Sequence, residues 1–158
     1  MAASTDGSLV TLVGSLFSDV FHKRYYDLLD SLLTPDFTFQ YPFPGFSAGA
    51  RGIQQFSTVF HTAFPGFELE IHDLFGTDQR CAIRWTLRGR QDGHLLGIPA
   101  TARYVSLSAI GIYGGSGGGG GPPIRIASGF LEMNTLGALQ QMNRLPALGT
   151  VFPSLRPG

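Results

Sequence analysis

Four polar side chains in the second half of the sequence could transfer or orient a proton: Gln91, Tyr113, Glu132 and Asn134. Alternate residues of a strand share one face, so Glu132 and Asn134 are expected to point the same way as Phe130. A carboxyl group in an apolar cavity has a raised pKa and suits a general acid. Glu132 is therefore a candidate proton donor or acceptor. The alternative is a carboxylate at an open sheet edge or paired with an arginine.

Two of the other three side chains, Asn134 and Tyr113, also have structural alternatives. Asn134 stands directly before an expected helix, so it could cap that helix, contact a substrate, or do both. The phenolic hydroxyl of Tyr113 could donate a proton or bind an oxyanion, whereas an aromatic on an edge strand would only cover the sheet. The amide of Gln91 can orient a substrate by hydrogen bonds, but an amide cannot exchange a proton near neutral pH.

Aromatic residues are candidates for the walls of a binding pocket. Gln40 and Tyr41 lie where an expected strand meets its loop, and Phe43 and Phe46 follow closely. These residues either rim a pocket or pack in the core. The remaining candidates for substrate contact are Phe60, Trp85 and Phe130. An aromatic side chain in a strand is more often part of the core than a ligand contact.

No metal, cofactor or phosphate site is expected. No two histidines have the spacing of metal ligands, and Cys81 is the only cysteine. His72 and Asp73 are neighbours in an expected strand and should lie on opposite faces, which argues against a dyad. The glycines from 114 to 121 are followed by no Gly-Lys-Ser/Thr sequence and open no helix, so they do not form a phosphate loop.

Composition limits the class of partner. Hydrophobic residues make up 43% of the 158 residues and charged residues 14%, which argues against a disordered chain. The eleven basic and eleven acidic residues balance, so no nucleic-acid partner is expected. No apolar run approaches the ~20 residues of a membrane span, and the start of the chain lacks the basic segment of a signal peptide. We expect a cytoplasmic protein without membrane contact.

Hydrophobic periodicity predicts the elements that would position these residues. Apolar residues at three- and four-residue steps predict helices over 9–21, 25–33, 53–63 and 135–143. Alternating patterns predict strands over 37–41, 67–75, 79–90, 102–113 and 124–133. Helices on one face of a curved antiparallel sheet define an α+β cone, whose concave side and helices enclose a cavity.

The faces of one strand and the irregular segments complete this outline. Trp85 and Gln91 share a face of the 79–90 strand, and the arginines on the other face suggest a solvated or dimer-contact surface. The chain, 1–158, is expected to be one domain. The Gly-rich segment 114–123 is expected to be a disordered hairpin extension, with a lid or hinge over a site as the alternative. The tail 147–158 is expected to be irregular.

Three segments match a known pattern in the same order. Phe64-Pro65-Gly66 is similar to a Phe-Pro-Asp segment. The stretch from Arg84 to Arg103 is similar to Arg-Trp, then Gly-Thr-His-x-Gly, then Gly-Ile-Pro-Pro-Thr-Gly-Arg, and Thr135 to Met142 is similar to a closing helix. Over roughly 34 to 146 the chain thus resembles the SnoaL-like polyketide cyclases, which have the nuclear transport factor 2-like fold. The resemblance implies an apolar pocket, a cofactor-independent enzyme of secondary metabolism, and a homodimer formed through the sheet.

The chain departs from this family pattern at three titratable positions. Asn134 stands where the pattern has the aspartate taken as the acid/base, Gln91 stands at a histidine position, and Gln40 at another. The family's aldol mechanism therefore does not transfer directly. The resemblance also implies that position 134 faces the pocket, which would bring Glu132 and Phe130 with it.

Three functions follow from these observations. The first is a cofactor-independent cyclase or isomerase of a hydrophobic polyketide, terpenoid or alkaloid intermediate. It would act by acid/base chemistry led by Glu132, or by a pericyclic closure of the Diels–Alder type, which needs only a shaped cavity and a hydrogen bond to a polarised carbonyl. The second is a non-catalytic module that binds a small molecule or a protein. The third is a hydrolase or dehydratase that uses a pocket-bound water.

Overall fold

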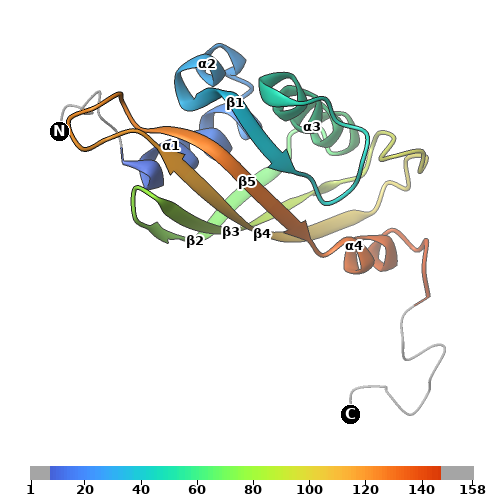
Figure 1. Cartoon of the computed structure of the whole chain (residues 1–158). Helices are drawn as coiled ribbons and strands as arrows, with labels where there is room; N and C mark the ends of the chain where they lie inside the picture. Colours follow the sequence, from blue (N-terminus) through green and yellow to red (C-terminus); the bar gives the residue numbers. More distant parts are fainter. Residues whose placement is uncertain (1–7, 147–158) are drawn as a thin grey trace, which may run out of the picture.

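A single curved sheet forms the base of the protein, and helices cover one of its faces (Figure 1). The computed structural model describes residues 8–146. The strand order is β1-β5-β4-β3-β2, with β1 parallel to β5 and the other pairs antiparallel. The strands are β1 (Leu33–Gln40), β2 (Glu68–Gly76), β3 (Arg80–Arg90), β4 (Tyr104–Ser116) and β5 (Arg125–Met133). The predicted α+β cone is confirmed.

The helices pack on the concave face of this sheet, except for the last. They are α1 (Leu9–Ser15), η1 (Leu16–His22), η2 (Tyr26–Leu28), α2 (Leu29–Leu32), α3 (Gly49–Ala63) and α4 (Thr135–Gln141). The η1 segment is a π-helix that continues α1. None of the helices within 8–146 is long and apolar enough to cross a membrane. α4 follows β5 directly and lies at the end of the sheet (Figure 1).

The second predicted helix is shorter than its periodicity indicated. The 25–33 segment forms only two short turns of helix, because Leu33 already pairs with Ile126 of β5 and begins β1. Pro35 thus lies inside a strand rather than stopping a helix. A proline is tolerated there because β1 is an edge strand, where a missing N–H costs no ladder hydrogen bond.

The core between helices and sheet is built from aromatic rings. Phe21 of η1 lies 5.5 Å from Trp85 of β3 and 5.7 Å from Phe56 of α3, measured between ring centroids. Phe56 and Phe60, one turn apart on α3, lie 4.9 Å from each other. Tilted and edge-to-face arrangements of this kind suit the quadrupoles of the rings. The core therefore fixes α3 and η1 against the centre of the sheet.

A β-bulge in β5 decides which of its side chains face the helices. Ser128 pairs with Gly114, but Ile126 pairs with the very next residue, Gly115, so one residue of β5 is extra. The bulge reverses the alternation of side chains beyond it. Ile126 and Leu131 are therefore both buried although they are five residues apart, while Phe130 and Glu132 share a face as expected. Phe130 and Glu132 lie on the outer face of the sheet.

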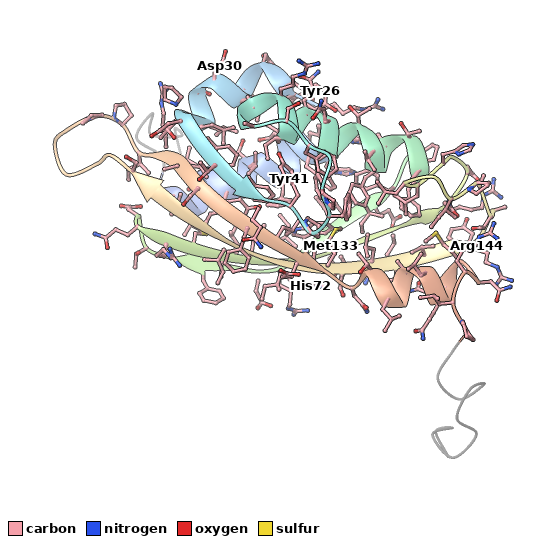
Figure 2. All side chains as sticks on the ribbon, turned by 45° about the vertical axis from the view of Figure 1, so that its right-hand side comes forward. Tyr26, Asp30, Tyr41, His72, Met133 and Arg144 are labelled. Atoms are coloured by element: carbon pink, nitrogen blue, oxygen red, sulfur yellow. The ribbon has the colours of Figure 1, made fainter. Side chains whose placement is uncertain are left out.

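A second bulge, in β2, overturns another expectation about faces. The pairing shifts by one residue between Ile71 and Asp73, so His72 and Asp73 do not alternate. Nε2 of His72 lies 2.8 Å from the hydroxyl of Thr86, and Asp73 accepts a hydrogen bond of 2.6 Å from Arg84. Both therefore lie on the outer face, and Figure 2 shows His72 on the side of the sheet away from the helices.

The glycine-rich connection begins later than its composition suggested. β4 runs on to Ser116, and Gly115 N–H donates a 3.0 Å hydrogen bond to the carbonyl of Gln79. Gly118 N–H then donates to the carbonyl of Pro122 at 2.7 Å. Positive φ angles from Gly117 to Gly120 explain why glycine occupies these turns. The predicted irregular tail, 147–158, lies outside the described residues.

Candidate functional site

An apolar pocket of about 260 Å³ lies where β5 leads into α4. Its walls come from α4, from the connection between β3 and β4, from α3, and from the segment after β1. The lining residues are Pro42, Phe43, Phe60, Leu95, Leu96, Ile98, Leu107, Met133, Thr135, Ala138, Leu139 and Met142. Thr135 is the only one of them with a polar side chain, and none of these residues titrates. The pocket therefore suits an uncharged, largely apolar ligand.

Hydrogen bonds at both of its ends hold α4 in place. The side-chain oxygen of Asn134 accepts a hydrogen bond of 3.0 Å from Gly137 N–H. Asn134 therefore caps the helix, which is one of the two roles predicted for it. At the other end the side chain of Gln141 makes two hydrogen bonds to the backbone of Ser106 in β4. It accepts from Ser106 N–H at 2.7 Å and donates to the Ser106 carbonyl at 3.0 Å. One wall of the pocket is thereby fixed to the sheet.

Gln91 fixes the opposite wall, the connection between β3 and β4. Its side chain is fully buried. The amide nitrogen donates to the carbonyls of Gly93 and Pro99, each at 3.2 Å, and the amide oxygen accepts from the Thr101 hydroxyl at 2.6 Å. The predicted contact between Gln91 and substrate is therefore replaced by contacts within the loop. Gln91 shapes the pocket without lining it.

Glu132, Phe130 and Gln40 all lie on the outer face, away from the pocket. Glu132 is exposed in a shallow groove that also contains Arg84 and Ile110. Phe130 and Gln40 are paired across β5 and β1 and line a second outer hollow. On β5 it is Met133 that reaches the pocket. The prediction that position 134 faces the pocket and brings Glu132 and Phe130 with it is wrong. Asn134 lies with Glu132 in the outer groove, so the alternation from 130 to 134 places all three on the outer face.

Tyr113 lies in the core, next to a small void of about 20 Å³, and not in the pocket. It is 1% exposed, and its ring centroid stacks 5.8 Å from that of Phe39. The ring occupies the space over Gly129, where a Cβ atom would come within 2.6 Å of it. Burial raises the pKa of Tyr113 well above its usual value, so the hydroxyl keeps its proton. β4 is a central strand, so the edge-strand alternative is also wrong.

Tyr41, Phe46 and Trp85 pack in the interior rather than around the pocket. Tyr41 lies between the helices and the sheet (Figure 2), and its ring is 4.6 Å from that of Phe46. Its hydroxyl is buried without a hydrogen-bond partner among the described residues, and burial raises its pKa. Trp85 is fully buried, and its Nε1 is likewise unpartnered there. The core alternative holds for Trp85.

Phe43 and Phe60 are the predicted contact residues that line the pocket. Sequence reasoning missed the loop residues Leu95, Leu96 and Ile98. The available signal was a run of apolar side chains inside a segment that reads as a loop, because exposed loops rarely carry such a run without a partner surface. Among residues 8–146, no group of three or more His, Cys, Asp or Glu side chains could hold a metal ion.

Comparison with known proteins places this arrangement in a family. Residues 11–142 match the SnoaL-like polyketide cyclases. The chain belongs to the SnoaL-like polyketide cyclase family. The resemblance in the sequence motifs is thereby confirmed, together with the nuclear transport factor 2-like fold. No curated protein sequence matches the chain.

Solved structures with the same fold cover most of this SnoaL-like chain. TsrD from Streptomyces laurentii is 26% identical, with a TM-score of 0.70, over 87% of this chain and 96% of that one. A proposed SnoaL-like polyketide cyclase from Jannaschia sp. CCS1 is 18% identical, with a TM-score of 0.73, over 92% and 99%. IdmH from Streptomyces antibioticus, a proposed polyketide cyclase, is 19% identical, with a TM-score of 0.69, over 87% and 99%.

Proposed function

We propose that the protein is a cofactor-independent cyclase or isomerase that closes a ring in an uncharged secondary-metabolite intermediate. The observation that carries this proposal is the apolar pocket of about 260 Å³, in which Thr135 has the only polar side chain among the lining residues that the structure describes. Family membership supports a cyclase or isomerase role in general. Polyketide, terpenoid and alkaloid intermediates with fused or unsaturated carbon frames match such a pocket.

The make-up of the pocket favours a pericyclic closure over acid/base chemistry. An aldol closure needs a base that removes a proton from carbon, and no lining residue can serve as one. A pericyclic closure needs the reacting ends held in a near-attack conformation, which a rigid apolar wall provides. In this mechanism the hydroxyl of Thr135, which lines the pocket, would donate a hydrogen bond to a carbonyl conjugated with the reacting double bond of the substrate and so lower the energy of its lowest unoccupied orbital.

The proposal is tested with extracts of the host from which this gene has been deleted. The purified protein, without added cofactor, is expected to convert an accumulated intermediate into a product of identical mass. Mass spectrometry and ultraviolet absorbance follow the conversion. A product that has gained or lost one water would instead indicate a hydrolase, hydratase or dehydratase, and the ring-closure proposal would fail.

Replacing Glu132 with glutamine is expected to leave the rate of this conversion within about twofold of that of the wild type. The reason is that Glu132 is exposed on the outer face, while the pocket opens on the other side of the sheet. The initial rate of Glu132→Gln, measured at equal protein concentration, checks this. A rate loss of about a thousandfold would restore Glu132 as the general acid or base and contradict the pericyclic mechanism.

A non-catalytic binding module is the second candidate, favoured by the same lack of titratable groups in the pocket. It predicts tight binding of the intermediate with no change in its mass or absorbance after long incubation. The hydrolase or dehydratase alternative needs a base that activates water. Its two candidates, Glu132 and Asp73, both lie outside the pocket, and Asp73 is paired with Arg84.

The outer face of the sheet supports a homodimer. It carries Phe75, Tyr104, Ile110 and Phe130, with exposed fractions of 64%, 77%, 49% and 36%. No element within residues 8–146 covers this face, which places large apolar side chains in water (Figure 1). A second copy of the chain would bury them.

Replacing Ile110 with aspartate is therefore expected to convert a dimer to a monomer, because a charged carboxylate in place of an apolar side chain would have to lose its water at the interface. Size-exclusion chromatography with light scattering measures the mass of the wild type and the variant. Tyr25→Asp is the matched control, since Tyr25 is 52% exposed but lies on the helical side. A monomeric wild type would refute the dimer.

A further inference from the structure

We infer that Leu96 is a specificity-determining residue whose side chain closes over the ligand at the open side of the pocket. The inference rests on the proposed function, in that the pocket must bind an apolar ligand. One turn, formed by Leu95, Leu96, Gly97 and Ile98, would then limit the size of the ligand that the pocket accepts.

The backbone of this turn is unsuited to leucine. Leu95 and Ile98 exchange two backbone hydrogen bonds of 3.0 and 2.9 Å, which leaves Leu96 and Gly97 as the two central residues of a tight hairpin. Their φ angles are 49° and 83°. Positive φ at both central positions characterises a type I′ turn, for which Asn-Gly is the favoured sequence. Leucine there is strained, because its Cβ approaches the carbonyl oxygen that follows.

The side chain of Leu96 is also poorly placed for the stability of the free protein. It is 56% exposed, whereas its neighbour Leu95 is 7% exposed and packs into the core. Both line the pocket. Leu96 therefore contributes little to the core of the free protein, yet it presents apolar surface at the pocket opening. A ligand in the pocket would cover that surface, and its burial would offset the strain of the turn.

The turn is held at a fixed distance from the wall that it faces. The side chain of Gln91 makes hydrogen bonds to Gly93, Pro99 and Thr101 and so fixes the connection between β3 and β4. The side chain of Gln141 makes a hydrogen bond to Ser106 and so fixes α4 to β4. Leu96 and Leu139 thus lie on two separately anchored walls of one pocket. Because hydrogen bonds fix both walls, the distance between them limits the width of the ligand that can bind.

The test compares Leu96→Asn with the wild type, using the neutral fluorescent probe N-phenyl-1-naphthylamine. Asparagine relieves the strain at positive φ and removes the apolar contact. The dissociation constant of the probe is expected to rise about five- to tenfold, and the midpoint of thermal unfolding to rise by about 2 °C. Binding of the probe thus weakens while the stability of the protein increases, a combination that a purely structural role of Leu96 would not produce.

Leu136→Asn is the matched control, since Leu136 is 54% exposed on α4 and does not line the pocket. This variant is expected to bind the probe like the wild type. If Leu96→Asn binds the probe unchanged while its unfolding midpoint falls, Leu96 serves stability and the inference is overturned. If the wild type does not bind the probe at all, the proposed binding function of the pocket itself fails, and the inference fails with it.

Discussion

Replacing Leu139 with tryptophan is expected to lower the rate of ring closure about 100-fold, because the indole ring would occupy part of the pocket and exclude the folded substrate. A substrate that loses this part of the pocket is expected to lose about 3 kcal/mol of binding in the transition state, which corresponds to that factor. Leu139 is half-buried on α4 and lines the pocket. The larger side chain therefore has room at the pocket opening, and the fold is expected to persist. The initial rate of the mass-neutral conversion measures the effect.

Leu136→Trp controls for a tryptophan on the same helix. Leu136 points into solvent at 54% exposure, so its replacement should change the rate less than twofold. Circular dichroism of both variants shows whether α4 and the sheet are retained. Equal activity of folded Leu139→Trp and wild type would mean that the reaction takes place elsewhere in the cone.

Replacing Gln91 with leucine is expected to lower the free energy of unfolding by about 3 kcal/mol, because several buried backbone groups of the loop lose their partners at once. The carbonyls of Gly93 and Pro99 would lose their donor, and the Thr101 hydroxyl would lose its acceptor. Chemical denaturation measures the change from the shift in midpoint at constant slope.

Gln140→Leu is the matched control for this substitution. Its side chain donates a single exposed hydrogen bond to the carbonyl of Pro146, so its loss should cost less than about 0.5 kcal/mol. Gln91→Leu is also expected to weaken binding of the naphthylamine probe, since the loop carries three lining residues. A stable Gln91→Leu variant with an intact pocket would show that the loop does not depend on this amide.

The fold could be predicted from the sequence because most segments have a clear period. The alternation in β3 placed Trp85 and the arginines on opposite faces, and the structure agrees: Trp85 is buried, and Arg84 and Arg88 make ion pairs with Asp73 and Glu70. The motifs of the loop and the closing helix indicated the family. What periodicity could not supply was the length of the 25–33 helix, since its leucines serve two short turns and then a strand.

The candidate site was less predictable because strand alternation fails at a bulge. One extra residue in β5 places Ile126 and Leu131 on the inner face although they are five residues apart, so Ile126 does not share the face of Phe130 and Glu132. A bulge depends on pairing with a distant strand, so the local sequence pattern of β5 does not predict one. The family resemblance implied that position 134 faces the pocket, whereas Asn134 lies with Glu132 in the outer groove. The amide of Gln91 could be recognised as unable to transfer a proton. Its structural role emerges only when Gly93, Pro99 and Thr101 are brought around it.

The central claim is that the pocket closes a ring by holding its substrate, without proton transfer from the protein. The most direct measurement is the wild-type conversion run in deuterium oxide, with mass spectrometry of the isolated product after exchange of its O–H and N–H groups. We predict a product with the mass of the starting intermediate and no deuterium on carbon. Deuterium at a carbon position, above the level of an enzyme-free control, would show proton transfer in the ring closure and contradict the account.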